Sequence, residues 1–299
     1  MTADTAEGHA GNYDLRSLQH ERRMLATYRR AVTQGETALL QPLANACWRA
    51  AAFEWALYGD AETVRRLWGE AARALAEGFA RRRAGFDPSP DQFVLALHFA
   101  IAARERDAFV ALATSAPNLR DGELRQARAF RGSRAHFHLA EGYALVARAL
   151  VEGAGAPARA ALESLDAARE ESDPGWWERQ FPDPLEAAWR TSEHEAVCLL
   201  LGGVARRVVD VSEAEREGDA PHMAADFART VDETLGRLEQ FIRHDFNHHP
   251  KLYVWLSGLS LCALAASAAL PMSWLGERHE AHATGYARLP LELLHHSSV

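Results

Sequence analysis

Three short turns, spaced at nearly equal intervals, divide the first half of the chain into pairs of apolar, helix-patterned segments. The turns are Tyr58-Gly59-Asp60, Arg104-Glu105-Arg106-Asp107 and Glu152-Gly153-Ala154-Gly155, about 47 residues apart, close to the period of paired-helix repeats. One helical hairpin cannot bury its apolar face alone, so such repeats stack on one another. The spacing therefore predicts an all-α protein of stacked antiparallel helical hairpins, an α-solenoid or tetratricopeptide-like array. Arrays of this kind usually present a binding surface.

Within these segments, apolar residues recur at three- and four-residue steps, which is the period of an amphipathic helix. One such stripe comprises Ala44, Cys47, Trp48, Ala51, Trp55 and Tyr58. No stretch alternates between apolar and polar residues for long enough to indicate a sheet. We expect a loose polar tail at residues 1–13 and a single all-α domain over residues 14–299. Three prolines interrupt the helical pattern at residues 171–184, a candidate sub-boundary or functional loop.

Residues 252–270 carry no charged side chain and are long enough to cross a bilayer. Two interpretations compete: a membrane span, or a helix buried at the centre of a large helical domain. The segment is rich in alanine and serine, contains Gly258 and lacks a flanking cluster of basic residues. Small residues allow close helix packing. This composition favours a buried C-terminal helix that closes the array.

Composition limits the partners and the compartment. The formal net charge is −8 and the isoelectric point is about 6.0, so the surface should repel nucleic acid and anionic membranes and attract a basic partner. The N-terminus has no apolar signal core. Cys47, Cys198 and Cys262 are unclustered and lie in apolar helical runs, which predicts buried thiols in a reducing compartment. We therefore expect a cytoplasmic protein that binds neither nucleic acid nor a membrane.

Arginine supplies almost all of the positive charge, since Lys251 is the only lysine. A GC-rich genome accounts for this bias most simply. The alternative is a requirement for the two-point contacts that a planar guanidinium makes with a carboxylate and that lysine cannot make.

Histidines are the main candidates for chemistry. His244, Asp245, Asn247, His248 and His249 form one cluster, and His279, Glu280 and His282 form another. Neither cluster has the spacing of the zinc protease motif, and capping of helix ends explains them more simply. His136 and His138 should point to different sides of one helix. A solvated helix face is the expected setting for the run Glu193-His194-Glu195. We expect no enzyme activity and no cofactor.

Two adjacent tryptophans, Trp176 and Trp177, lie in the proline-rich segment among acidic residues. They anchor a protein partner in one interpretation and fold back over the helical core in the other. An acidic connector follows at residues 213–219. The candidate partner-binding residues are Glu170, Glu171, Asp173, Trp176, Trp177, Glu178, Asp183, Glu213, Glu215, Glu217 and Asp219. Their charge suits a basic partner.

The chain also resembles the immunity protein 49 family of bacterial polymorphic toxin systems. The resemblance rests on the tryptophan-containing, alanine-rich helix at Trp48–Asp60, the apolar stretch from Leu252 to Ala266, and the leucine–proline ending at Leu289–Leu294. It spans residues 40–294 and transfers no catalytic motif. The resemblance implies a protein that neutralises a cognate toxin by binding it.

Three functions are therefore considered. The first is a toxin inhibitor that acts by protein–protein contact, with a basic toxin as its partner. The second is a tetratricopeptide-like adaptor or regulator that binds peptides in a concave groove. The third is a helical metalloenzyme that uses the C-terminal histidines.

Overall fold

The computed structural model describes residues 4–81, 89–115, 134–212, 220–244 and 254–268. In these ranges the protein is all-α, as the sequence predicts, and forms no β-strand. The helices in chain order are α1 (Asp4–Thr33), the 3-10 turn η1 (Thr37–Leu39), α2 (Leu40–Tyr58), α3 (Ala61–Arg81), α4 (Pro90–Ala103), α5 (Arg106–Ser115), α7 (Arg134–Glu152), α8 (Gly155–Glu170), α9 (Pro174–Gln180), α10 (Pro184–Ser212), α11 (Ala220–His244) and α12 (Leu256–Ser267).

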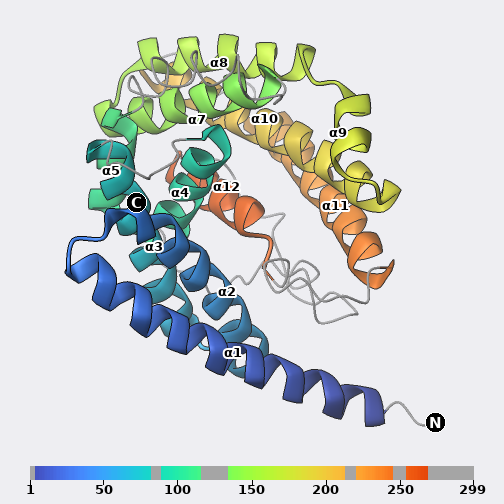
Figure 1. The fold of residues 1–299 in the computed structure, drawn as a ribbon. Coiled ribbons are helices and arrows are strands. Elements are labelled where there is room, and N and C mark those ends of the chain that lie inside the picture. The colour runs from blue at the N-terminus through green and yellow to red at the C-terminus, as the bar shows by residue number, and fades with distance from the viewer. Residues whose placement is uncertain (1–3, 82–88, 116–133, 213–219, 245–253, 269–299) are drawn as a thin grey trace.

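Helices that are neighbours in the chain pack against each other and build an array. The pairs α1–α2, α2–α3, α3–α4, α7–α8, α8–α10 and α10–α11 are all in contact. In Figure 1 these helices follow an arc from α1 through α5, α7 and α8 to α10 and α11. The last described helix, α12, lies on the inner side of the arc and packs against α4 and α10. The C-terminal helix therefore closes the array, in agreement with the prediction from its apolar composition.

The three turns that define the repeat share one backbone feature. Gly59, Arg104 and Gly153 all have positive φ, at 63°, 60° and 63°. This left-handed conformation ends a helix by turning the next N–H back onto its last carbonyl groups. Glycine adopts it without strain, whereas Arg104 is the one non-glycine residue with positive φ in the described chain. After Gly59, Asp60 accepts a hydrogen bond from the Thr63 backbone N–H at 3.1 Å and so begins α3.

Two segments differ from the sequence-based expectation. The first helix begins at Asp4, so it extends into residues 1–13, which were expected to form a loose tail. The proline-rich segment 171–184 does interrupt the long helices, but it also contains the short helix α9. Pro174 and Pro184 are the first residues of α9 and α10. Proline is favoured at this position because its missing N–H would have no partner inside the helix.

Charged pairs attach the polar helix α1 to its neighbours. Arg49 of α2 donates from Nε and Nη2 to the two carboxylate oxygens of Glu21, at 2.6 and 3.0 Å. Arg29 makes the same two-point contact with Glu70 of α3, at 2.6 and 2.5 Å. A lysine cannot form this fork. Arginine therefore has a structural use in this part of the protein, whatever the origin of the compositional bias.

The helix α12 is buried along most of its length, and every residue from Leu256 to Ala265 is inaccessible to solvent or nearly so. The hydroxyl group of Ser260 in α12 donates to the carbonyl oxygen of His98 in α4, at 2.9 Å, or to that of Leu256, at 2.8 Å. Among the described residues, no helix combines the length and the hydropathy that crossing a bilayer requires. The buried interpretation of this segment is thus confirmed for its described part.

The helices α7 and α8 lie close together at Gly142. A Cβ atom at Gly142 would lie 2.7 Å from Cγ and Cδ2 of Leu165. Leu165 is itself buried, with 2% of its surface exposed, so it has little room to move. The absence of a side chain at position 142 therefore permits this packing.

We expect Gly142→Ala to lower the free energy of unfolding by about 1–3 kcal/mol, because the added methyl group overpacks the contact with Leu165. Gly236→Ala in α11 is the matched control, since its added Cβ would meet nothing within 4 Å. Alanine there should raise stability by up to about 1 kcal/mol through helix propensity. Urea denaturation of both variants tests this; a stabilised Gly142→Ala variant would contradict the close approach.

Candidate functional site

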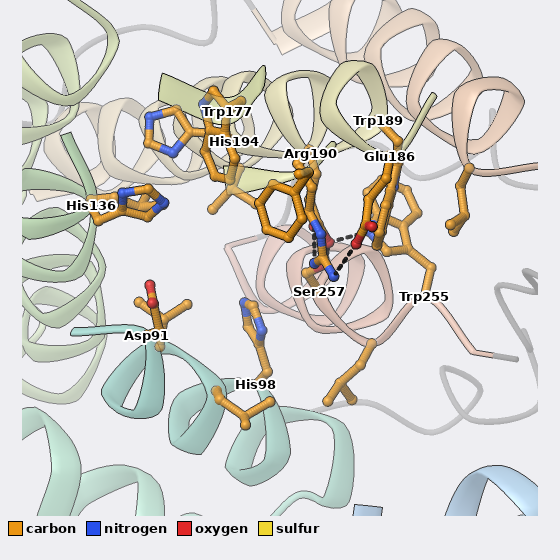
Figure 2. Close-up of a pocket in the computed structure, with 18 of the residues that line it drawn as sticks. Asp91, His98, His136, Trp177, Glu186, Trp189, Arg190, His194, Trp255 and Ser257 are labelled. Atoms are coloured by element: carbon orange, nitrogen blue, oxygen red, sulfur yellow. Dashed lines mark hydrogen bonds and ion pairs between the residues drawn. The ribbon is translucent and has the colours of Figure 1, made fainter. Parts of the chain in front are cut away.

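The inner side of the arc contains a cavity of about 600 Å³ between α4, α7, α9, α10 and α12. A volume of this size lies in the range of ligand-binding pockets. In Figure 2, Asp91 and His98 of α4 lie across the cavity from Arg190 and His194 of α10, and His136 of α7 closes one side. These five helices, together with Trp48 of α2 and Leu238 of α11, thus contribute to one concave site.

One face of α10 supplies the largest share of the wall. Glu186, Trp189, Arg190, Glu193 and Val197 all line the cavity, and they recur at the three- and four-residue steps that place side chains on one face of a helix. Asp183 sets the start of α10, because its carboxylate accepts a hydrogen bond from the Leu185 backbone N–H at 2.8 Å.

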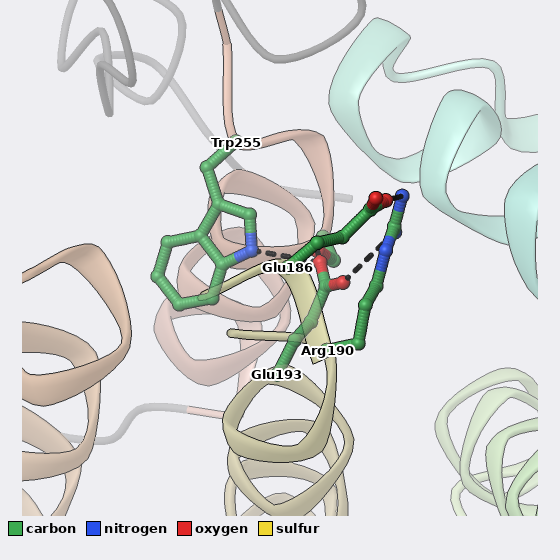
Figure 3. Close-up of polar contacts among 5 residues, drawn as sticks. Glu186, Arg190, Glu193 and Trp255 are labelled. Atoms are coloured by element: carbon green, nitrogen blue, oxygen red, sulfur yellow. Dashed lines mark hydrogen bonds and ion pairs between the residues drawn. The ribbon is translucent and has the colours of Figure 1, made fainter. Parts of the chain in front are cut away.

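A cluster of charged side chains joins α10 to α12 (Figure 3). Arg190 lies between two carboxylates, 3.6 Å from Glu186 Oε1 and 3.4 Å from Glu193 Oε2. The other oxygen of Glu193 accepts hydrogen bonds from the Trp255 indole N–H, at 3.0 Å, and from the Ser257 hydroxyl group. Glu193 therefore holds the first residues of α12 in place and helps to fix the orientation of Arg190.

The guanidinium of Arg190 also lies over aromatic rings. Its central carbon is 4.2 Å from the ring centroid of Trp189 and 5.4 Å from that of Phe181. Attraction between a cation and an aromatic face contributes about 0.5–2 kcal/mol, more where water is excluded. The cavity wall therefore already binds one cation, that of the protein itself.

The tryptophans of α9 form another part of the wall. Trp177 is 7% exposed, and its ring stacks on Phe181 at a centroid distance of 6.0 Å. The His136 ring lies 4.8 Å from both Trp176 and Trp177. Trp177 has therefore folded back onto the helices, as the second interpretation of the sequence proposed. Both tryptophans nevertheless line the cavity.

Burial keeps two of the cavity histidines neutral. It lowers the pKa of His98 to about 3. Burial also lowers the pKa of His194, and it outweighs the hydrogen bond with the Ala168 carbonyl oxygen at 3.1 Å, which acts in the opposite direction. A carbonyl oxygen only accepts, so Nε2 of His194 carries the proton. Nε2 of His98 has no hydrogen-bond partner in the described part of the chain.

The lowered pKa of His98 predicts a loss of stability in acid. An unfolded histidine titrates near 6.5, so between pH 6.5 and about 3 the unfolded chain binds more protons than the folded one. We expect the free energy of unfolding to fall by about 2 kcal/mol more in the natural protein than in His98→Gln between pH 6.5 and 4.5. Urea denaturation of both proteins at the two pH values measures this difference. Parallel pH profiles would show that His98 is not held neutral.

The acidic residues expected to bind a partner lie at the ends of α8, α9 and α10, and several of them have structural partners. Asp173 caps α9 through the Gly175 N–H and pairs with Arg179 at 2.9 Å. Asp183 caps α10, and Glu171 lies 3.6 Å from His138. Glu170 and Glu178 are exposed. The remaining four, Glu213, Glu215, Glu217 and Asp219, lie outside the described residues.

Sequence reasoning did not identify the residues of α4 and α10 as a site. The expected solvated face at residues 193–195 is wrong for Glu193, which lines the cavity, and for His194, which is 4% exposed. It is correct for Glu195, which is exposed. The available signal was the spacing of Glu186, Trp189 and Glu193, which places two acids and an aromatic ring on one helix face. That signal does not reveal which other helices this face of α10 packs against.

The two C-terminal histidine clusters fall almost entirely outside the described residues. Of the first cluster only His244 is described, at the end of α11 and 3.7 Å from Asp183. In the described ranges, no three histidine, cysteine, aspartate or glutamate side chains come together as metal ligands would. All three cysteines are buried, as expected, and burial raises the pKa of Cys198 and of Cys262 to about 12.

Comparison of the chain with known proteins finds no matching family model, no matching curated protein and no matching solved structure.

Proposed function

We propose that this protein binds a cognate bacterial toxin and neutralises it by protein–protein contact. The class of partner comes from the resemblance to the immunity protein 49 family. The net charge of −8 supports a basic partner, because an acidic surface accelerates the association of oppositely charged proteins. A helical array also suits this task, since a rigid scaffold loses little conformational entropy on binding.

The observation that carries the proposal is the cavity of about 600 Å³ on the inner side of the array, lined by tryptophans and carboxylates. Tryptophans in partly buried positions dominate the energetics of many interfaces. In this cavity Trp255 is held by its hydrogen bond to Glu193, and Trp177 by packing against Phe181, before any partner arrives. The exposed acids Glu170 and Glu178 lie on helices next to the cavity wall and extend the acidic surface.

A tetratricopeptide-like adaptor has less support. Such proteins bind extended peptides along the concave face of the array. In this chain α12 lies on that face, packed against α4 and α10. A long peptide would have to displace ten buried residues of the protein itself. A partner that inserts a single side chain into the remaining cavity has no such cost.

Co-expression with the product of the adjacent gene tests the proposal. We expect the two proteins to purify as a complex, and we expect this protein to restore growth to cells that express the toxin. An unrelated basic protein of similar size serves as the control for non-specific charge attraction. The absence of both a complex and a growth rescue would refute the proposal.

A further inference from the structure

We infer that the cavity on the inner side of the array binds the cationic side chain of an arginine or a lysine that a partner presents. The inference rests on the proposed function, because it states how a basic toxin would be recognised. It also makes a claim about the cavity that can be tested without the toxin. Three properties of the cavity lead to it: its charge, its aromatic faces and the state of His98.

Carboxylates outnumber the resident guanidinium. Of the described charged residues, Asp91, Glu186 and Glu193 line the cavity together with a single arginine, Arg190. Glu193 accepts hydrogen bonds from Trp255 and Ser257 and pairs with Arg190. The Glu186 carboxylate has a single ionic partner in the described part of the chain, Arg190 at 3.6 Å. Asp91 makes no hydrogen bond or ion pair with the described residues, and it faces the cavity from the first turn of α4. Two carboxylates are therefore available to a second cation.

The aromatic faces suit a cation with an apolar stem. Arg190 over Trp189 and Phe181 shows that these walls hold a guanidinium at 4.2–5.4 Å from a ring centroid. Trp176 and Trp177 provide further aromatic surface beside His136. The aliphatic part of an arginine or lysine side chain can pack against such rings while its charged end reaches the carboxylates. A ligand without positive charge would lack the attraction of Asp91, which is exposed, and of Glu186, which is half-buried.

His98 adds a hydrogen-bonding group of the right kind. Its side chain is 93% buried, since 7% of its surface is exposed, and it points from α4 toward the cavity in Figure 2. Burial keeps the imidazole neutral, and a neutral imidazole has one nitrogen that accepts. Nε2 is without a partner among the described residues. In the tautomer that leaves Nε2 unprotonated, a guanidinium or ammonium N–H can donate to this nitrogen without the repulsion that a charged histidine would exert.

The test uses N-acetyl-arginine amide and its neutral isostere, N-acetyl-citrulline amide. Binding is measured by titration calorimetry and by the fluorescence of the cavity tryptophans. We expect the arginine derivative to bind at least tenfold more tightly than the citrulline derivative. Asp91→Asn and Glu186→Gln should each weaken arginine binding about 3- to 10-fold, since each removes one nearby opposite charge. Glu163→Gln, an exposed carboxylate on α8, is the matched control and should leave binding unchanged.

The outcomes separate this inference from the proposed function. Equal binding of arginine and citrulline derivatives, or of the natural protein and Asp91→Asn, would overturn the cation site. If neither derivative binds, the complex with the toxin provides the test, and Asp91→Asn and Glu186→Gln must each weaken that complex. If both variants bind the toxin as tightly as the natural protein does, the cation site is rejected, while the proposed function stands. Binding of the arginine derivative without any toxin complex would retain the cation site and would reject the proposed function.

Discussion

Replacing Trp189 with alanine is expected to lower the free energy of unfolding by about 3–5 kcal/mol, the usual cost of truncating a large buried aromatic residue. The indole ring is 2% exposed and stacks on Phe241 of α11 at a centroid distance of 5.8 Å and an interplanar angle of 10°. The central guanidinium carbon of Arg190 lies 4.2 Å from the centroid of the same ring. Truncation would leave a void between α10 and α11 and would remove one wall of the cavity. Urea denaturation and binding of the arginine derivative both report the effect.

Trp189→Phe is the matched control for this prediction. Phenylalanine keeps a ring against Phe241 and Arg190 and loses the indole N–H, which has no hydrogen-bond partner in the described chain. We expect a smaller destabilisation of about 1–2 kcal/mol, because part of the volume and no hydrogen bond is lost. The arginine derivative should still bind. If alanine and phenylalanine cost the same, ring stacking is not what holds α10 against α11.

Removing the carboxylate of Glu193 should have the second-largest effect. We expect Glu193→Ala to lower the free energy of unfolding by about 2–4 kcal/mol, because it leaves the Trp255 N–H and the Ser257 hydroxyl group without an acceptor and unbalances Arg190. Since these contacts join α10 to α12, the amides of α12 should also exchange hydrogen faster. Urea denaturation and hydrogen exchange measure the two effects.

Glu195→Ala provides the matched control on the same helix. Glu195 is exposed, so its loss should change stability by no more than about 0.5 kcal/mol. Both variants remove one negative charge, and both add the same helix-favouring residue. Similar stabilities for the two variants would mean that the contacts of Glu193 with α12 do not contribute to folding.

The cavity is built by residues that also stabilise the fold. Trp189 and Glu193 stabilise the protein and also shape the site, through the packing of α10 against α11 and α12. A preorganised wall of this kind needs no rearrangement to accept a side chain, which is the condition for tight association by a small contact. Asp91 and Glu186, in contrast, contribute few contacts to the fold. Their replacement should therefore affect binding more than stability.

Much of the fold could be predicted from local signals. Helix-period stripes and the turns at residues 58–60, 104–107 and 152–155 marked α2 through α8, and each turn does contain a left-handed helix end. Asp60, the second residue after Tyr58, caps the start of α3 in the structure through the Thr63 backbone N–H. The beginning of α1 at Asp4 and the short helix α9 were not expected. Both segments are short of apolar residues or rich in proline, so their pattern alone carries little information about helix formation.

The candidate site could be predicted only in part. Trp176 and Trp177 were singled out because adjacent tryptophans among acids are unusual, and both line the cavity. Asp91, His98 and Glu193 were not, because each fits an ordinary helix pattern when its own segment is read alone. A single histidine or carboxylate becomes part of a site only through what lies opposite it. That information is absent from local spacing.

By itself, the sequence determined that this protein is an array of helices, where its main turns lie, and that the apolar segment near its end is buried. These features depend on residues within one or two helical turns of each other, and therefore periodicity and turn chemistry reveal them. Only the tertiary structure decided which helix faces meet. The hydrogen bond from Ser260 to the His98 carbonyl oxygen joins residues 162 positions apart, and it helps to bring α12 beside the acids of α4 and α10. Each apolar stripe could be buried against several other helices. Which helices pair is therefore decided by the packing of the whole protein, since only one arrangement buries all of the stripes at once.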